Sequence, residues 1–311
     1  MSLSAWETLP VLPLAGAGGW AHADVAVLPD GGLLTAHPDG GALLVSDASG
    51  STRVVPAPLH EAHGLHLAGD AVWVADVGLK LKPDGDGGYV ETGPWSGRVL
   101  QLGLDGSVRQ ELTTPPRTSD RPYLPTAVLA DGTGQVWVAD GYGASELHVY
   151  DEQGVQQRSL TGAESAAGHL DCPHALLLDT RRAEPELVIA DRANHRLVVL
   201  GLDGTFHREV TGVLHLPSAL AISNDLLLVA ELHGRVTVLD PDDRVVSRSG
   251  LDPSEPQRPG WPNALADDRL VRPEPGDGVL NSPHGIAVDA SGRVVLAEWL
   301  IGGRLLASQL T

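Results

Sequence analysis

The chain has 311 residues, and its 37 glycines and 23 prolines, without long apolar stretches of helical period, argue against a helical protein. An apolar share of 42% is enough for a packed core, which excludes an intrinsically disordered chain. The formal net charge of −19 argues against nucleic acid and anionic membranes as partners.

A pattern of roughly 40–50 residues recurs along the chain, which is typical of a propeller or solenoid. Each copy contains a run of β-forming residues, usually ending in Ala-Asp or Ala-Glu, followed by Arg-Val and an Asp-Gly turn. The first copy is degenerate and ends in Ala36-His37. The six runs span residues 33–37, 72–76, 136–140, 187–191, 227–231 and 294–298.

Each copy divides into four short strands. In the fourth copy we expect strands at 174–178, 187–190, 196–200 and 206–210, with Leu202-Asp203-Gly204 as the turn of the last hairpin. Four strands in each of six copies predict an all-β fold, a six-bladed β-propeller that forms a single domain over residues 1–311.

The last copy lacks a fourth strand. Its third strand is expected to end near Leu306, and the stretch from Trp6 to Leu14 is free to supply the missing strand and close the ring. Two insertions, at about 78–97 in blade 2 and 250–278 between blades 5 and 6, are expected on one face of the ring. They would wall a pocket over the central channel.

Three histidines, His63, His174 and His284, lie about 110 residues apart at the start of the innermost strand of alternate copies. The intervening copies have Thr126 and Ser218 at this position. Three imidazoles around one axis predict a metal site with an open coordination position, for Zn²⁺ or another divalent transition metal. The alternative is that histidine merely caps backbone groups at a strand start.

In the first copy the equivalent position falls near Ala23 or Asp24, with His22 slightly out of register. This makes His22 a weaker candidate ligand. His37, His60 and His66 are weaker candidates as well.

Two further segments are expected on the same face, because they follow the second strand of their blades. Tyr142, beside a divalent cation, is a candidate base, since the cation favours phenolate. Arg192 is a candidate partner for a substrate carboxylate. The alternatives are that Tyr142 packs a loop and that Arg192 pairs with Asp191 or with the acidic surface.

The recurring carboxylates Asp76, Asp140 and Asp191 are predicted to be structural. A carboxylate at the end of the second strand can accept turn N–H groups in every blade.

These motifs resemble the NHL repeat, and within that class the chain resembles the lyase domain of peptide-amidating enzymes, peptidyl-α-hydroxyglycine α-amidating lyase. Repeat similarity covers nearly the whole chain. The segments that carry the likeness are Val74 to Leu79, Val138 to Tyr142, Pro173 to Leu176 with Ala190 to Asn194, and Pro283-His284.

The resemblance implies a six-bladed propeller with zinc held by His63, His174 and His284. It also implies that Tyr142 is the catalytic tyrosine and that Arg192 lines the site.

The chain departs from the family pattern in three places. The family binds a structural Ca²⁺ through an aspartate after the last histidine, where this chain has Gly285, and through a carbonyl at the position of Leu65. Gly143 replaces a cysteine that follows the catalytic tyrosine, and no blade 1 arginine occurs between Trp20 and His37.

The leading hypothesis is a metal-dependent lyase that cleaves a C–N bond in a small or peptide-like α-hydroxy substrate. A hydrolase of the lactonase or strictosidine-synthase-like kind and a non-catalytic NHL interaction module are the alternatives.

The single cysteine, Cys172, cannot form an intramolecular disulfide, and the N-terminus lacks the basic and apolar regions of a signal peptide. We therefore expect a soluble cytoplasmic protein.

Overall fold

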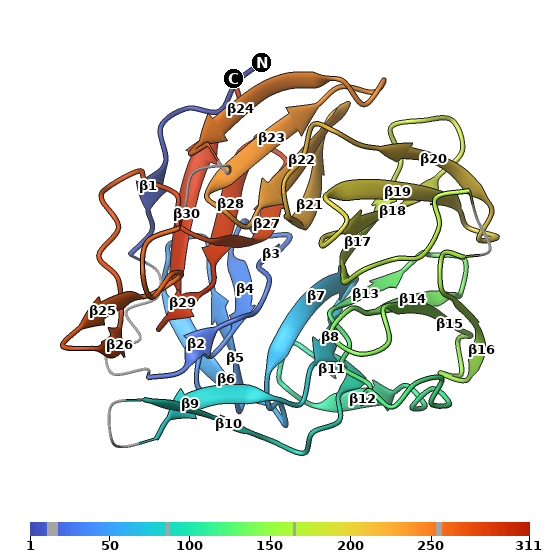
Figure 1. Cartoon of the computed structure of the whole chain (residues 1–311), viewed down its shortest axis with the longest axis horizontal. Coiled ribbons are helices and arrows are strands. Elements are labelled where there is room, and N and C mark those ends of the chain that lie inside the picture. Colours follow the sequence, from blue (N-terminus) through green and yellow to red (C-terminus); the bar gives the residue numbers. More distant parts are fainter. Residues whose placement is uncertain (11–17, 85–87, 164–165, 253–256) are drawn as a thin grey trace.

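The computed structural model describes residues 1–10, 18–84, 88–163, 166–252 and 257–311. These ranges contain strands and turns, and no helix among them is long and apolar enough to cross a membrane. Six antiparallel sheets of four strands stand around a central axis (Figure 1). The predicted six-bladed β-propeller is therefore confirmed.

The strands of each blade follow one another from the axis outward. Blades 1 to 3 contain β3 (Ala26–Val27), β4 (Leu33–Ala36), β5 (Ala42–Ser46), β6 (Thr52–Pro56); β7 (Ala62–Ala68), β8 (Ala71–Asp76), β11 (Arg98–Gly103), β12 (Val108–Glu111); and β13 (Ala127–Ala130), β14 (Val136–Asp140), β15 (Glu146–Tyr150), β16 (Gln156–Leu160). Blades 4 to 6 contain β17 (Pro173–Asp179), β18 (Glu186–Asp191), β19 (Arg196–Gly201), β20 (Phe206–Val210); β21 (Pro217–Ser223), β22 (Leu226–Glu231), β23 (Arg235–Leu239), β24 (Val245–Gly250); and β27 (Pro283–Val288), β28 (Arg293–Glu298), β30 (Arg304–Gln309), β1 (Glu7–Thr8).

The N-terminal strand closes the ring. β1 pairs with β30, so that Glu7 faces Ala307 and Thr8 faces Leu306. The two ends of the chain lie side by side (Figure 1), and the Ser2 and Thr311 main chains exchange two hydrogen bonds of 2.9 Å. The predicted closing strand is thus confirmed for residues 7–8, whereas the part of that stretch from residue 11 onward lies outside the described residues.

Both predicted insertions contain a small hairpin. The first holds β9 (Lys80–Pro83) and β10 (Tyr89–Thr92), and the second holds β25 (Ala264–Ala266) and β26 (Arg269–Val271). A third pair was not predicted, because it belongs to no repeat: β2 (Trp20–Ala21) joins β29 (Leu300–Ile301).

The core lies between the blades. Six buried apolar clusters each combine side chains from two adjacent blades, including the pair formed by blades 6 and 1. The second strands are buried on both faces, which explains their continuous apolar runs, whereas the outermost strands are partly exposed.

The carboxylates that end the second strands hold the turns of their blades. Asp76 accepts the main-chain N–H of Glu61 at 2.8 Å, Asp140 accepts that of Leu124 at 2.7 Å, and Asp191 accepts that of Asp171 at 2.7 Å. Their predicted structural role is confirmed.

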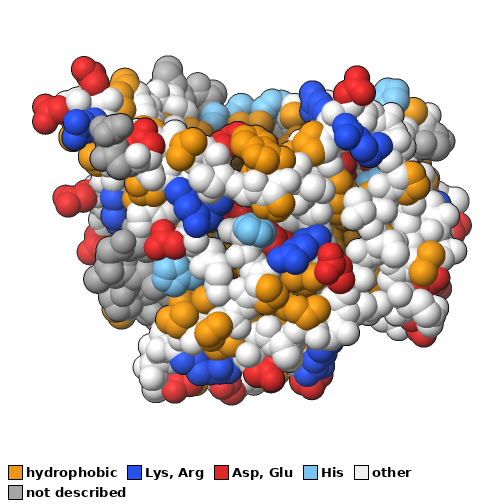
Figure 2. Space-filling model, turned by 90° about the horizontal axis from the view of Figure 1, so that it is seen from below, with side chains coloured by type: hydrophobic (Ala, Val, Ile, Leu, Met, Phe, Trp, Pro, Cys, Tyr) orange, Lys and Arg blue, Asp and Glu red, His pale blue; other side chains and the backbone are white. Residues whose placement is uncertain are grey.

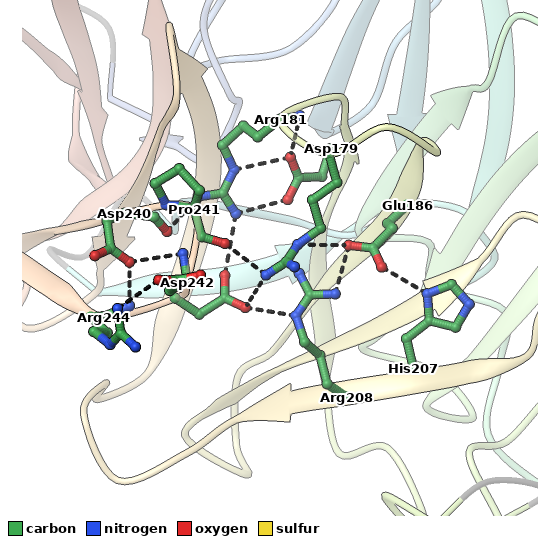
Figure 3. Close-up of polar contacts among 11 residues, drawn as sticks. Asp179, Arg181, Glu186, His207, Arg208, Asp240, Pro241, Asp242 and Arg244 are labelled. Atoms are coloured by element: carbon green, nitrogen blue, oxygen red, sulfur yellow. Dashed lines mark hydrogen bonds and ion pairs between the residues drawn. The ribbon is translucent and has the colours of Figure 1, made fainter.

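An ionic network joins blades 4 and 5 (Figure 3). The buried Arg181 bonds both oxygens of Asp179, at 3.0 and 2.8 Å, and the Asp240 carbonyl at 2.9 Å. Arg208 bonds Glu186 and Asp243, each at 2.6 Å. The network ties the end of β17 to the turn between β23 and β24.

Candidate metal centre and catalytic site

The three repeat histidines each sit at an irregularity in an innermost strand. Pairing with the second strand shifts register between Ala62 and Leu65, between Pro173 and Ala175, and between Pro283 and Gly285. A β-bulge leaves a residue out of the ladder and re-aims its side chain. The bulges thus explain why the histidines point toward the axis although their neighbours pair normally.

The repeat register does bring His63, His174 and His284 together. Their ring centroids lie 4.6 Å apart for the first pair, and 4.7 Å apart for each pair that includes His284. Their exposed fractions are only 2%, 2% and 3%. Neighbouring strands approach closely here: a Cβ on Gly64 would lie 2.6 Å from the Thr126 carbonyl oxygen.

Main-chain carbonyls of the next blade fix two of the rings. Nδ1 of His63 lies 2.5 Å from the Thr126 oxygen, and Nδ1 of His174 lies 2.6 Å from the Ser218 oxygen. A carbonyl can only accept, so Nδ1 carries the proton and Nε2 keeps its lone pair. Metal-binding histidines are commonly oriented by such a bond.

Burial holds the imidazoles neutral. It lowers the pKa of His63, His174 and His284 well below the usual value, and neighbouring histidines and Arg192 act in the same direction. Neutral imidazole is the form that binds a metal.

His284 provides the clearest sign of a missing ligand. Both of its ring nitrogens are buried and lack a hydrogen-bond partner among the described residues. A buried polar group without a partner costs about 1–3 kcal/mol, so such groups need an explanation. A metal bound by Nε2 would account for one of the two nitrogens, and the donor set therefore fits zinc or a similar cation.

A fourth imidazole, His22, joins the cluster. Its ring lies 4.6 Å from that of His63 and 4.7 Å from that of His284. The ligand atoms of His22, His63 and His284 all lie within 4.8 Å of one another, so these three could hold a metal ion. His22 was only a weaker candidate from the sequence, and His37, His60 and His66 make none of these ring contacts.

Tyr142 reaches the centre of the cluster from the turn after β14. Its hydroxyl lies 3.1 Å from Nε2 of His63, 3.1 Å from Nε2 of His174 and 3.2 Å from Nε2 of His22. Burial raises the pKa of Tyr142 to about 12, although Arg192 acts in the opposite direction. Its hydroxyl therefore occupies the point at which the imidazoles converge, and loop packing is not its only role.

Arg192 supplies the positive charge of the site. Its guanidinium donates to the Tyr142 hydroxyl at 3.3 Å and contacts Cys172 Sγ at 3.2 Å. Asp191 is instead held by Arg196 at 2.7 Å, so the alternative of an Arg192–Asp191 pair is wrong. No carboxylate among the described residues forms an ion pair with Arg192.

A buried ion pair supports His22. Glu61 and Lys80 are each only 4% exposed and are in direct contact, and the other Glu61 oxygen lies 3.2 Å from Nδ1 of His22. Lys80 also donates to the Trp20 carbonyl at 3.0 Å. Burial, together with Lys80 and Arg192, lowers the pKa of His22 to about 3.

The channel beneath the histidines differs from the pattern that the resemblance implies. A Cβ on Gly285 would lie 2.4 Å from Oδ1 of Asp24, so Asp24 fills the space in which a side chain after the last histidine would project. That oxygen accepts the N–H of Val25 at 2.8 Å and of Ile286 at 3.1 Å, while burial raises the Asp24 pKa to about 7. A Ca²⁺ site here stays a prediction.

A cavity of about 290 Å³ opens beside Tyr142 and His22 on the site face. The first insertion contributes Leu81 of β9 to its wall, as predicted, whereas no described residue of the second insertion lines it. Trp299 also lines it and packs against the His22 ring, with centroids 5.7 Å apart. Histidine side chains reach the surface along the upper edge of the molecule in Figure 2.

Comparisons with known proteins support the fold. No protein-family model matches the chain, and a search of curated proteins also found no match. Among solved structures, virginiamycin B lyase from Staphylococcus aureus aligns at TM-score 0.61 and 12% identity over 100% of both chains. A streptogramin B lyase aligns at TM-score 0.58 and 13% identity, over 100% of this chain and 98% of the other. At such low identity the likeness shows a shared propeller fold.

Proposed function

We propose that the protein is a metal-dependent lyase acting on a small or peptide-like α-hydroxy substrate over the central channel. One arrangement carries the proposal: His22, His63 and His174 converge on the Tyr142 hydroxyl, to which Arg192 also donates. His284 packs against all three of these rings, and Arg192 forms no ion pair with a described carboxylate. Zinc, or another divalent transition metal, would be held by His63, His174 and His284.

When bound, the metal would supply Lewis acidity toward a hydroxyl or carboxylate oxygen of the substrate. Arg192 would hold the substrate carboxylate through its guanidinium, whose donors suit bidentate binding. Tyr142 would take the proton of the α-hydroxyl group as phenolate, a form that burial disfavours but that Arg192 and a bound cation would favour.

The reaction balances without a further reactant. Loss of the hydroxyl proton lets a C=O bond form as the C–N bond breaks, and the nitrogen leaves with the electron pair and receives a proton. An N-acyl-α-hydroxyglycine would thus give a primary amide and glyoxylate.

The structural neighbours support a lyase on this fold. Two of them are lyases by name, and a catalytically inactive histidine-to-alanine variant of virginiamycin B lyase, bound to quinupristin, aligns at TM-score 0.59 and 11% identity. That variant links a histidine to activity in a propeller of this shape.

The test is glyoxylate release from N-acetyl-α-hydroxyglycine by protein that has been stripped of metal and reloaded with zinc. Tyr142→Phe should keep its metal but lose roughly 10²–10⁴-fold in kcat, the usual contribution of a positioned base. Tyr89→Phe is the control, because the Tyr89 hydroxyl donates to the Gly18 carbonyl, at 3.1 Å, and takes part in none of the contacts described for the four histidines. No turnover by fully loaded protein would sink the proposal.

Metal analysis separates the alternatives. A non-catalytic module would contain less than one tightly bound transition metal, unchanged when His63, His174 and His284 are all replaced by alanine. A hydrolase would cleave simple lactones. Among the described residues that line the channel cavity, Asp24 is the only one with a carboxylate. A cytoplasmic location, and the absence of nucleic-acid and membrane partners, are part of the proposal, and cell fractionation would check the location.

A further inference from the structure

We propose that the cavity beside Tyr142 selects substrates that carry a bulky apolar group on the side opposite their carboxylate. The substrate class is then an N-acyl-α-hydroxyglycine whose acyl part, or preceding residue, is aromatic or branched aliphatic. This inference rests on the proposed function and deepens it.

The cavity walls are chiefly apolar. Some of the apolar side chains, among them Leu79, Leu81 and Trp299, are only half-buried, which leaves their surfaces open to a ligand. Binding pockets commonly combine such walls with a few polar groups that fix orientation. The apolar lining residues are Trp20, Val77, Leu79, Leu81, Leu124 and Trp299.

The buried charges in the wall already have partners. Lys80 donates to Glu61 and to the Trp20 carbonyl, and Glu61 also faces His22. A ligand in the cavity therefore has no unsatisfied buried charge to neutralise at Glu61 or Lys80. Recognition there depends on removal of apolar surface from water.

Arg192 is not among the residues that line this cavity. Tyr142 does line it, and the Tyr142 hydroxyl accepts a hydrogen bond from Arg192 at 3.3 Å. A substrate that reacts at this oxygen and places its carboxylate on Arg192 must extend its remaining part toward the apolar walls. The carboxylate on one side of the reacting carbon thus meets a cation, and the group on the other side meets apolar side chains.

The cavity is large enough to hold an aromatic ring. An apolar cavity of about 150 Å³ binds benzene, and this one has a volume of about 290 Å³. It can therefore hold a phenyl or indole ring, and an acetyl group would leave most of it unfilled.

The test uses N-acetylglycine and N-benzoylglycine, which lack the hydroxyl and cannot react, as probes of zinc-loaded protein by isothermal titration. We expect N-benzoylglycine to bind at least about tenfold more tightly, because its ring buries apolar surface. Leu79→Trp should fill the cavity, and Leu81→Asp should place a charge in its wall. Each should reduce the preference to less than about threefold.

Leu265→Trp is the matched control, because Leu265 of β25 is 47% exposed and lies outside this cavity. Its preference should equal that of the unaltered protein. Equal affinities for the two probes in the unaltered protein, or a preference that survives in folded Leu79→Trp and Leu81→Asp, would overturn the inference.

Turnover separates the two proposals. If the benzoyl probe binds preferentially but N-benzoyl-α-hydroxyglycine releases no glyoxylate, the cavity assignment stands and the lyase proposal fails. If the acetyl and benzoyl substrates turn over with equal kcat/KM and their probes bind equally, the lyase stands and the cavity assignment fails.

Discussion

Four imidazoles surround the candidate metal site, and they differ in how firmly neighbouring groups hold each ring. His63 and His174 bond main-chain carbonyls of the inner strands, whereas His22 follows the two-residue strand β2 and is held by the Glu61 side chain. Backbone partners in a closed ring move less than a side chain does. The rings of His63 and His174 are therefore held more firmly than that of His22.

This difference predicts an order of metal affinities. His174→Ala should weaken zinc binding by more than about 100-fold, because a ligand is lost, and His22→Ala by less than about tenfold. Competition with a chelating dye would measure both, with the exposed His169→Ala as control. The reverse order would assign His22, in place of His174, to the ligand set.

His148 of β15 makes stability depend on pH. Its side chain is buried, Nδ1 lies 2.8 Å from Ser159 Oγ, and burial lowers its pKa from 6.5 to about 4. At pH values between about 4 and 6.5, His148 is protonated in the unfolded chain but not in the folded chain. The free energy of unfolding therefore falls as the pH decreases through this range.

His148 is expected to lower the free energy of unfolding by about 2 kcal/mol between pH 7 and pH 5. Urea unfolding of the unaltered protein and of His148→Gln at both pH values isolates it, since other buried histidines contribute equally to both proteins. Identical pH slopes would show that His148 does not titrate differently in the folded state.

The sequence could predict that His63, His174 and His284 lie together because they follow the repeat, and it ranked His22 lower because that residue does not. Asp24 takes the repeat position in blade 1, and His22 arrives through the β2–β29 pair, which has no counterpart in other blades. The Glu61–Lys80 contact was also unpredictable, since it joins a strand start to an insertion. Tyr142 and Arg192 follow the second strands of blades 3 and 4, so their common face was predictable.

At the level of elements, the closing strand β1 is short, and the residue before it contributes most of the contact. Trp6 is 5% exposed, lies in the apolar cluster between blades 5 and 6, and donates its Nε1–H to Ser249 Oγ at 2.9 Å. It therefore anchors the N-terminal segment across two blades.

Trp6→Ala should reduce the free energy of unfolding by about 3–5 kcal/mol, the usual cost of removing a buried tryptophan. Trp95→Ala is the matched control, because Trp95 is 53% exposed, and should change stability by less than about 0.5 kcal/mol. Chemical denaturation measures both, and equal effects would show that the closing segment is dispensable.

The strand order of every blade was predictable from periodicity, because apolar runs mark the buried second strands and Asp-Gly turns mark the last hairpins. In the fourth blade the predicted strands differ from β17 to β20 by at most one residue at either end. The hairpins inside the insertions were not predicted, because they pack on no repeated surface.

At the level of the whole molecule, the ring depends on ties between blades. Arg181 is 1% exposed and lies between Asp179, which is fully buried, and Asp243 of the next blade. Removal of the cation would leave the buried Asp179 without an ion-pair partner among the described residues, whereas Asp243 would keep Arg208.

Arg181→Met should therefore destabilise the fold by about 3–5 kcal/mol. Arg244→Met is the control: Arg244 and its partner Asp242 are 73% and 63% exposed, and such pairs contribute about 1 kcal/mol or less. Similar losses in the two variants would show that the Figure 3 network does not hold blades 4 and 5 together.

The three inner-strand histidines belong to blades 2, 4 and 6, which are not neighbours in the ring. A cation held by all three would connect three sheets that do not border one another. Separation of any one of these blades from the ring would require release of the cation, so metal binding and the stability of the ring would be thermodynamically linked. At a free concentration 1,000-fold above its dissociation constant, a ligand specific for the folded state adds about 4 kcal/mol of stability. A site suited to catalysis would thereby also hold the propeller closed at its axis.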